Sequence, residues 1–279
     1  CYDYEKMQGN DNINALYEDK YKNLWVGTDR GIYRYNPVTD RFSFMDVKDK
    51  KTGEYANNWI QAIAGDGKGN VWALLPDVGV FRYHNNDVTY YSVLPNNGSF
   101  KEKFPANLCV DKNGYAWVVT TEKGIYKYNK HTDRFDKVIA KNGETLDGKY
   151  FALATEDVDG TLIFASSNGY LYRYSTTNND FKKINFSAEG KIYLRSLECF
   201  DDEIWIGTQH GLYIINKQTG NERLLHQEPL NNFSLSDDII YCIYKSRNGD
   251  AWLGTSYGGA DYMTRKKFGF QAYGLWSGL

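Results

Sequence analysis

The chain has 279 residues, and its 33 Lys and Arg nearly balance its 35 Asp and Glu, which gives a formal net charge of −2. This balance excludes the strongly basic surface that recruits nucleic acid or an anionic membrane. Aromatic residues make up 16% of the chain, which argues against disorder, and no apolar run approaches the roughly 18–20 residues of a membrane helix. The composition predicts a soluble domain rich in aromatic side chains, with no membrane contact by this segment.

Residues 13–45 form the first recognisable unit. Short apolar strands are expected at 13–17, 24–28, 32–35 and 41–45, and Gly, Asn, Asp or Pro residues bound each of them. Gly31 lies in a tight reversal that often needs a positive φ. No segment of the chain shows a sustained period of 3.6 residues. The pattern predicts a four-stranded antiparallel meander.

The same unit recurs along the chain at an interval of roughly 45 residues. A bulky residue occupies the same place in the second strand of every copy: Trp25, Trp72, Trp117, Ile163, Trp205 and Trp252. Both faces of these small sheets are apolar or aromatic, so each sheet must pack against copies of itself. Repeated four-stranded sheets that pack in this way form a β-propeller. We therefore predict an all-β fold with six recognisable antiparallel blades and the tryptophans and Ile163 in the core between them.

The ends of the sequence leave the number of blades open. Residues 268–273 read as the fourth strand of the sixth unit, residues 2–5 as a further outer strand, and residues 274–279 as the start of another repeat. Either the N-terminal strand closes a six-bladed ring, or the chain is part of a seven-bladed propeller. We expect residues 1–279 to be a single propeller domain and a fragment of a longer protein.

Cysteine and acidic motifs give no sign of a metal or cofactor. The four cysteines, Cys1, Cys109, Cys199 and Cys242, include no Cys-x-x-Cys pair and lack clustered histidines. The last three lie in apolar runs and are expected to be buried free thiols. Cys1 is either a lipidated mature terminus or the boundary of a fragment. The Asp157–Gly160 segment lacks the later ligands of a calcium loop, so we expect an ordinary hairpin turn.

The repeats resemble the two-component regulator propeller repeat. The likeness is best at residues 10–42 and 235–255, where a polar segment, an apolar strand, a turn and Trp-x-Gly-Thr follow one another. Trp-x-Gly-Thr is complete in the units of Trp25, Trp205 and Trp252, whereas the second, third and fourth units depart from it.

This resemblance implies the extracytoplasmic sensor region of a bacterial hybrid two-component system histidine kinase. It implies a periplasmic location and an oligosaccharide ligand derived from a glycan. It also implies further propeller repeats and a downstream signalling domain in the same polypeptide, so that any kinase activity would lie outside this chain. A homodimer is left open.

Candidate binding residues lie before the first strands and between the second and third strands of each unit. These segments are expected at one end of the propeller, where side chains vary without disturbing the core. Aromatic rings there could stack on sugars, and charged groups could bind hydroxyls and carboxylates. The candidates are Arg30, Trp59, Asp77, Lys123, Tyr150, Tyr193, Arg195, His210, Asp237 and Tyr257.

Two other functions are weighed against this non-catalytic sensor. The same end could hold a partner chain. Alternatively, it could carry a lyase or a glycan-cleaving site: streptogramin lyases are also propellers, and of the histidines only His210 falls in such a turn. Glycan hydrolysis needs two carboxylates about 5–9 Å apart, for which Asp77, Glu122, Asp237 and Asp238 are available. The basic residues flanked by aromatics, such as Arg34 and Arg82, are expected to be solvated or salt-bridged rather than a nucleic-acid platform.

Overall fold

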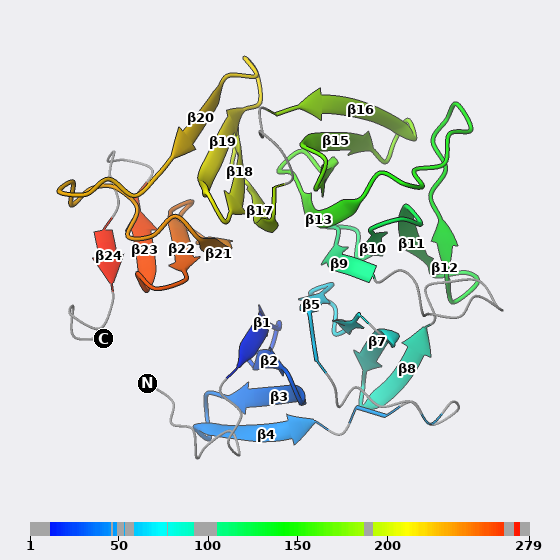
Figure 1. Ribbon diagram of the computed structural model, residues 1–279. Coiled ribbons are helices and arrows are strands. Elements are labelled where there is room, and N and C mark those ends of the chain that lie inside the picture. The colour runs from blue at the N-terminus through cyan, green and yellow to red at the C-terminus, as the bar shows by residue number, and fades with distance from the viewer. Residues whose placement is uncertain are drawn as a thin grey trace. The chain divides into compact units, whose positions relative to one another are not determined.

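The computed structural model describes residues 12–45, 47–48, 53, 59–76, 78–91, 105–186, 192–264 and 271–273. In this part of the chain, six four-stranded antiparallel sheets form the blades of a β-propeller (Figure 1), as predicted. No helix in it is long and apolar enough to cross a membrane. The predicted strands at 2–5 and 268–270, the tail at 274–279, Cys1 and Asp77 lie outside the described residues.

The strands follow the chain in sequence order within every sheet. The first three sheets contain β1 (Ile13–Glu18), β2 (Leu24–Thr28), β3 (Gly31–Asn36) and β4 (Arg41–Met45); β5 (Ala62–Gly65), β6 (Val71–Leu75), β7 (Gly79–His84) and β8 (Asp87–Tyr91); and β9 (Pro105–Val110), β10 (Ala116–Thr120), β11 (Ile125–Asn129) and β12 (Arg134–Lys137). The last three contain β13 (Phe151–Glu156), β14 (Leu162–Ser166), β15 (Tyr170–Ser175) and β16 (Asp180–Asn185); β17 (Leu194–Cys199), β18 (Glu203–Thr208), β19 (Gly211–Asn216) and β20 (Glu222–Leu225); and β21 (Ile240–Lys245), β22 (Ala251–Thr255), β23 (Ala260–Met263) and β24 (Gln271–Tyr273).

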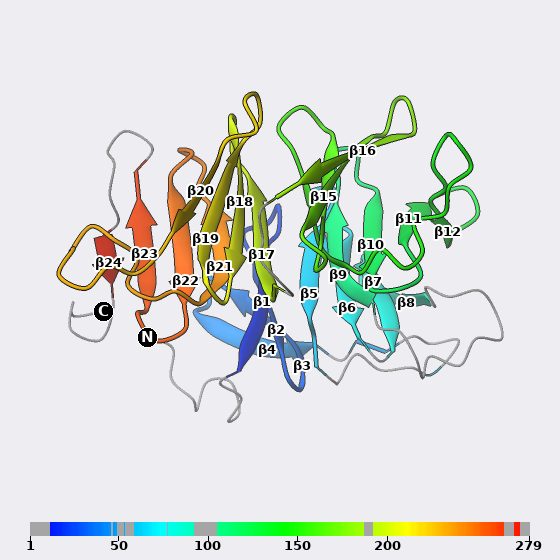
Figure 2. The ribbon, with the colours of Figure 1, turned by 45° about the horizontal axis from the view of Figure 1, so that its top comes forward.

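The chain divides into two compact units, Cys1–Ala154 and Thr155–Leu279. In the first unit β5 lies beside both β1 and β9, and in the second β17 lies beside β21 (Figure 1). The strands of a sheet run alternately up and down between two sets of turns (Figure 2). In each unit, we call the end that holds the second-to-third strand turns and the segments before the first strands the near end. The far end holds the first-to-second and third-to-fourth strand turns.

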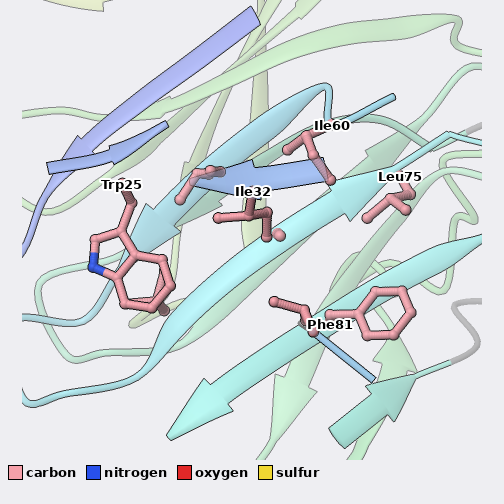
Figure 3. Close-up of a cluster of buried hydrophobic side chains, with 9 residues drawn as sticks. Trp25, Ile32, Ile60, Leu75 and Phe81 are labelled. Carbon is pink, nitrogen blue, oxygen red and sulfur yellow. The ribbon is translucent and has the colours of Figure 1, made fainter. Parts of the chain in front are cut away.

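The predicted core between neighbouring sheets is confirmed at five of the six positions. Trp25, Trp72, Trp117, Ile163 and Trp205 are at most 2% exposed. In the first unit, Trp25 and Ile32 of the first sheet share a cluster with Ile60, Leu75 and Phe81, which lie in or just before the second sheet (Figure 3). Burial of such side chains from both sheets contributes roughly 1.5–3 kcal/mol for each aliphatic or Phe side chain.

Three of the buried tryptophans also satisfy their indole N–H inside the repeat. Trp25 Nε1 donates to Asp19 at 2.9 Å, and Trp117 Nε1 donates to Asp111 at 2.9 Å. Both aspartates lie in first-to-second strand turns, where they also accept backbone N–H groups. Trp205 Nε1 donates instead to Glu203 of its own strand at 2.9 Å. These bonds fix the tryptophan orientation and close the turn, since a buried N–H without a partner is costly.

The Gly-Thr pair of the Trp-x-Gly-Thr motif has two separate structural roles. The hydroxyl of Thr28 donates to the carbonyl of Gly31 at 2.9 Å, and Thr208 does the same to Gly211, so the threonine closes the second-to-third strand turn. The preceding glycine makes room for the next sheet, because a Cβ at Gly27 would lie 2.6 Å from Ile60 Cγ2. The motif therefore reflects packing between sheets and turn formation.

Two sequence predictions of burial are wrong in the sixth sheet. Trp252 is 36% exposed and packs on Tyr262 at a ring distance of 4.6 Å. Cys242, expected to be a buried thiol, is exposed, whereas Cys199 is buried and Cys109 is half-buried. Among the described residues of this unit, no later sheet follows the sixth one to cover the face that carries Trp252. Cys242 lies on β21, the first strand of that sheet, which has a strand partner on one side only.

Candidate functional site

In the first unit, the near end brings Arg30 and Trp59 to neighbouring segments. Arg30 is exposed in the β2–β3 turn, where its backbone N–H donates to Thr28 Oγ1 at 3.2 Å. Trp59 is 51% exposed. The next residue, Ile60, donates its N–H to the carbonyl of Thr28 at 2.9 Å and so ties the two segments together.

A second pair of candidates in the first unit follows the same arrangement. Lys123 is exposed in the β10–β11 turn, with its N–H on Thr120 Oγ1 at 2.9 Å. Tyr150 precedes β13, is half-exposed and has a positive φ of 56°. The N–H of Gly148 donates to the carbonyl of Glu122 at 2.8 Å, which holds the Tyr150 segment against the Lys123 turn.

In the second unit, the structure assigns Asp237 a role that the sequence did not reveal. Its Oδ1 accepts the N–H of Ile239 at 3.0 Å, and its Oδ2 accepts the N–H of Tyr257 at 2.7 Å. The carboxylate therefore joins the segment before β21 to the β22–β23 turn. Tyr257, in that turn, is 93% exposed. Asp237 positions the turn, and the Tyr257 ring is the accessible group.

His210 lies in the neighbouring β18–β19 turn of the same unit. Its backbone N–H donates to Thr208 Oγ1 at 2.9 Å, and its exposed ring places Nε2 3.0 Å from the Gln209 amide nitrogen. The adjacent Gly211 N–H donates to the carbonyl of Asp238 at 2.7 Å. The turn of His210 is thus connected to the segment that contains Asp237, and through Asp237 to the turn of Tyr257.

The first strands of several sheets contain a register shift near their start, and two of these strands lie in the second unit. The register shifts between Leu194 and Ser196 in β17, and between Ile240 and Cys242 in β21. The bulged residues are Arg195 and Tyr241, and both are exposed. Bulges re-aim side chains and are common beside functional sites.

The two bulged residues contact each other. The Arg195 guanidinium lies 5.0 Å from the centroid of the Tyr241 ring. Tyr193, two residues before Arg195, is 64% exposed. Tyr241 ends the 237–241 segment that the sequence offered as a candidate region, but it was not among the ten residues singled out. The pair offers a flat aromatic face and a cationic hydrogen-bond donor side by side.

The acidic groups at this end are held by local contacts. Asp238 Oδ1 accepts the N–H of Gln227 at 2.6 Å and lies 3.7 Å from His226 Nδ1. Both oxygens of Asp237 face backbone N–H groups. Within the described part of the chain, no three His, Cys, Asp or Glu side chains group in a way that could hold a metal ion.

The fold is a β-propeller of four-stranded sheets, and two segments of the chain are similar to a known repeat family. Residues 7–30 and 234–257 match the family model for the two component regulator propeller. The resemblance predicted from the Trp-x-Gly-Thr units is therefore confirmed. The sequence finds no match among curated proteins.

The solved structures of similar fold include extracellular domains of hybrid two-component systems. The extracellular domain of a hybrid two-component system from B. thetaiotaomicron matches 94% of this chain with a TM-score of 0.70 and 26% sequence identity. A second such domain from the same organism matches 95% with a TM-score of 0.69 and 19% identity. The chain spans only 33% and 35% of these two structures.

Virginiamycin B lyase from Staphylococcus aureus has the same fold as well. It matches 95% of this chain, which covers 84% of the lyase, with a TM-score of 0.66 and 14% identity. At this level of identity the likeness shows the fold alone, because one fold hosts many unrelated functions.

Proposed function

We propose that this chain is the ligand-sensing, non-catalytic propeller of the extracytoplasmic part of a hybrid two-component sensor kinase, located in the periplasm. The family match and the 26% identical extracellular domain support this proposal. In it, residues 1–279 form one propeller domain within a longer polypeptide, whose further repeats and signalling domain transmit the signal. The ligand is an oligosaccharide derived from a glycan.

The bulged Arg195–Tyr241 pair carries the proposal. An aromatic ring offers an apolar face to a sugar ring, and a guanidinium donates to hydroxyls or a carboxylate. The exposed rings of Tyr193 and Tyr257 extend this aromatic surface, and His210 adds a polar group. In the first unit, Arg30, Trp59, Lys123 and Tyr150 are the corresponding candidates.

The hydrogen bonds that the acidic side chains at the near end accept favour binding without catalysis. Asp237, one of the four carboxylates considered for glycan cleavage, uses both oxygens to hold backbone N–H groups. A general acid or base must instead reach its substrate proton. His210, the lyase candidate, faces the Gln209 amide.

Calorimetric titration of the full chain with a panel of oligosaccharides tests the proposal. We expect saturable heat from at least one glycan, and on the order of tenfold weaker binding for Arg195→Ala and for Tyr241→Ala. Two matched controls should bind as the wild type does: Arg223→Ala, an exposed arginine paired with Glu203, and Tyr244→Ala, an exposed ring on the same strand as Tyr241. No heat from any glycan, or equal losses in the controls, would refute the proposal.

A second candidate function is the binding of a partner chain or of a second copy. The loop between β20 and β21 exposes Leu230 fully and Phe233 by 68%. Exposed apolar side chains of this kind occur at protein interfaces. If Leu230→Ser and Phe233→Ser together change the sedimentation behaviour of the chain, this function gains support.

A further inference from the structure

A cavity of about 240 Å³ opens at the far end of the first unit. Its walls come from the β1–β2 turn of the first sheet, around Asn23, and from the β5–β6 and β7–β8 turns of the second sheet, around Asn70 and Asn86. It is smaller than the roughly 300–1,000 Å³ of most drug-sized sites. The cavity therefore suits a single ring rather than a chain of sugars, and it uses none of the near-end candidates.

Aromatic side chains form much of the wall. Trp25 and Tyr83 lie 5.0 Å apart between ring centroids, and Tyr17 and the largely exposed Tyr21 complete the surface. A Cβ at Gly65 would overlap the Tyr17 ring, so that glycine allows the ring to lie against the second sheet. Such flat faces accept a ring compound.

The cavity is also lined by Arg34, and other sheets carry an arginine at the equivalent position of their third strand. Arg34, Arg82 and Arg173 occupy the third strands, each opposite the bulky second-strand residue of its sheet. Arg82 lies 3.3 Å from the carboxylate of Asp133, in the third-to-fourth strand turn of the next sheet. Arg173 pairs with Asp159 of its own sheet. These two arginines are salt-bridged, as predicted.

Arg34 differs from them. Its guanidinium lies 5.8 Å from the Trp25 ring, and no carboxylate of the described residues forms an ion pair with it. Asp19, which also lines the cavity, already accepts the Trp25 indole, the Asn23 amide and two backbone N–H groups. These bonds outweigh the effect of burial and hold the pKa of Asp19 below its usual value.

Comparison with the third sheet shows which residue stands where a counter-ion for Arg34 would be expected. In the third sheet, Asp133 accepts the hydroxyl of Tyr128 at 2.6 Å and has a positive φ of 52°. In the second sheet, Asn86 has the same relation to Tyr83, with a φ of 64°. Asn86 therefore stands where the next interface has Asp133, and it is neutral.

We propose that the cavity binds a ring compound that bears one carboxylate, which pairs with Arg34 as the carboxylate of Asp133 pairs with Arg82. The exposed ring of Tyr21 and the half-buried ring of Tyr83 pack on the body of the ligand. Both a uronic acid sugar and an aromatic acid have this chemistry. An arginine that lacks an internal counter-ion pairs well with a ligand carboxylate, often in a bidentate manner.

Calorimetry on the full chain with three probes tests this site. The probes are D-glucuronate, 4-hydroxybenzoate and D-glucose, the last differing from glucuronate in its neutral terminal group. We expect saturable binding of at least one acid, with glucose on the order of tenfold weaker or worse. The acid that binds identifies the source of the ligand. If neither acid binds, the proposal is wrong.

Two substitutions and their matched controls then locate the binding. Asn86→Asp supplies the internal carboxylate and should weaken acid binding about tenfold or more, as should Arg34→Gln. Asn179→Asp makes the same change at the same turn position of the fourth sheet, where Asn179 accepts the Tyr174 hydroxyl at 2.9 Å. Together with Arg82→Gln it should leave acid binding unchanged.

Asn86→Asp is nearly isosteric, so it keeps the test valid even if Arg34→Gln does not fold. Equal affinity of the Asn86→Asp variant and the wild type for the acid would overturn the site. Arg195→Ala should not alter acid binding, so the outcome here is independent of the oligosaccharide proposal.

Discussion

Substitution of Lys217 by Met should leave the buried carboxylate of Asp157, in the second unit, without its nearest cation. The ammonium of Lys217 contacts Asp157 Oδ1 and the carbonyl of Phe200, and the two charged side chains are only 9% and 2% exposed. Removal of one partner of such a pair costs about 3–5 kcal/mol, because the other charge stays in a poorly solvated place. The Arg173 guanidinium, 3.7 Å from Asp157, and the N–H of Val158 at 2.7 Å remain as partial compensation.

These remaining partners place the expected loss at the lower end of that range, about 3 kcal/mol. Asp157→Asn should cost a similar amount, because it leaves Lys217 buried beside neutral groups. The double variant removes both charges, so we expect it to lose about 2 kcal/mol less than the sum of the single variants.

Urea unfolding at neutral pH, followed by tryptophan fluorescence, measures all three free energies. Lys137→Met is the control, because Lys137 forms an exposed pair with Asp147 at 2.6 Å that should contribute less than about 1 kcal/mol. If the losses of the two single variants simply add, or if Lys137→Met costs as much as Lys217→Met, then burial of the pair does not determine its energy.

Three further predictions follow from buried groups in the repeats. Burial raises the pKa of the partly buried Glu198 above 4.5, against the opposing effects of the Cys199 N–H and two lysines. Its stabilising contribution is therefore complete below about pH 4.5 and is lost as the pH rises through the raised value. Glu198→Gln should exceed the wild type in stability at neutral pH but not near pH 4; an equal difference at both in urea titrations would contradict this. Gly207→Ala should cost about 1–3 kcal/mol, because the new Cβ would overlap the hydroxyl of Ser196; a larger gain in melting temperature from Ser196→Ala in the Gly207→Ala background than in the wild type is the check. Trp72→Phe should destabilise about 1–2 kcal/mol less than Trp117→Phe, because the buried Trp72 Nε1 has no partner in the described chain whereas Trp117 bonds Asp111; equal losses on denaturation would show that the indole bonds contribute nothing.

Local sequence was sufficient to predict the sheets. The four strands expected at 13–45 match β1 to β4 to within one residue at each end, because glycine and asparagine turns mark their limits and each strand pairs with its neighbour in the chain. The Trp-x-Gly-Thr motif indicated how the sheets pack and how the turns close, since the tryptophan and glycine serve packing and the threonine closes the turn.

The candidate site could be predicted only in outline. The sequence placed the candidates in loops but did not show the hydrogen bonds that connect these loops, and it did not show that Asp237 holds the Tyr257 turn. The importance of Tyr241 depends on a register shift within β21, which alternation of apolar residues along one strand does not reveal. The exposure of Trp252 likewise depends on which sheet follows its own, a fact that no single repeat contains.

Differences between copies of the repeat reveal function that a single copy hides. Arg34 and Arg82 occupy the same place in two sheets, so the sequence alone treats them as equivalent. Their electrostatics differ because the turn of the following sheet supplies Asp133 to Arg82 but Asn86 to the surroundings of Arg34. Stability alone would favour a carboxylate at both places, since it neutralises the cation. The neutral residue coincides with the cavity beside Trp25 and Tyr83, and binding of an acid from outside accounts for both the missing charge and the open space.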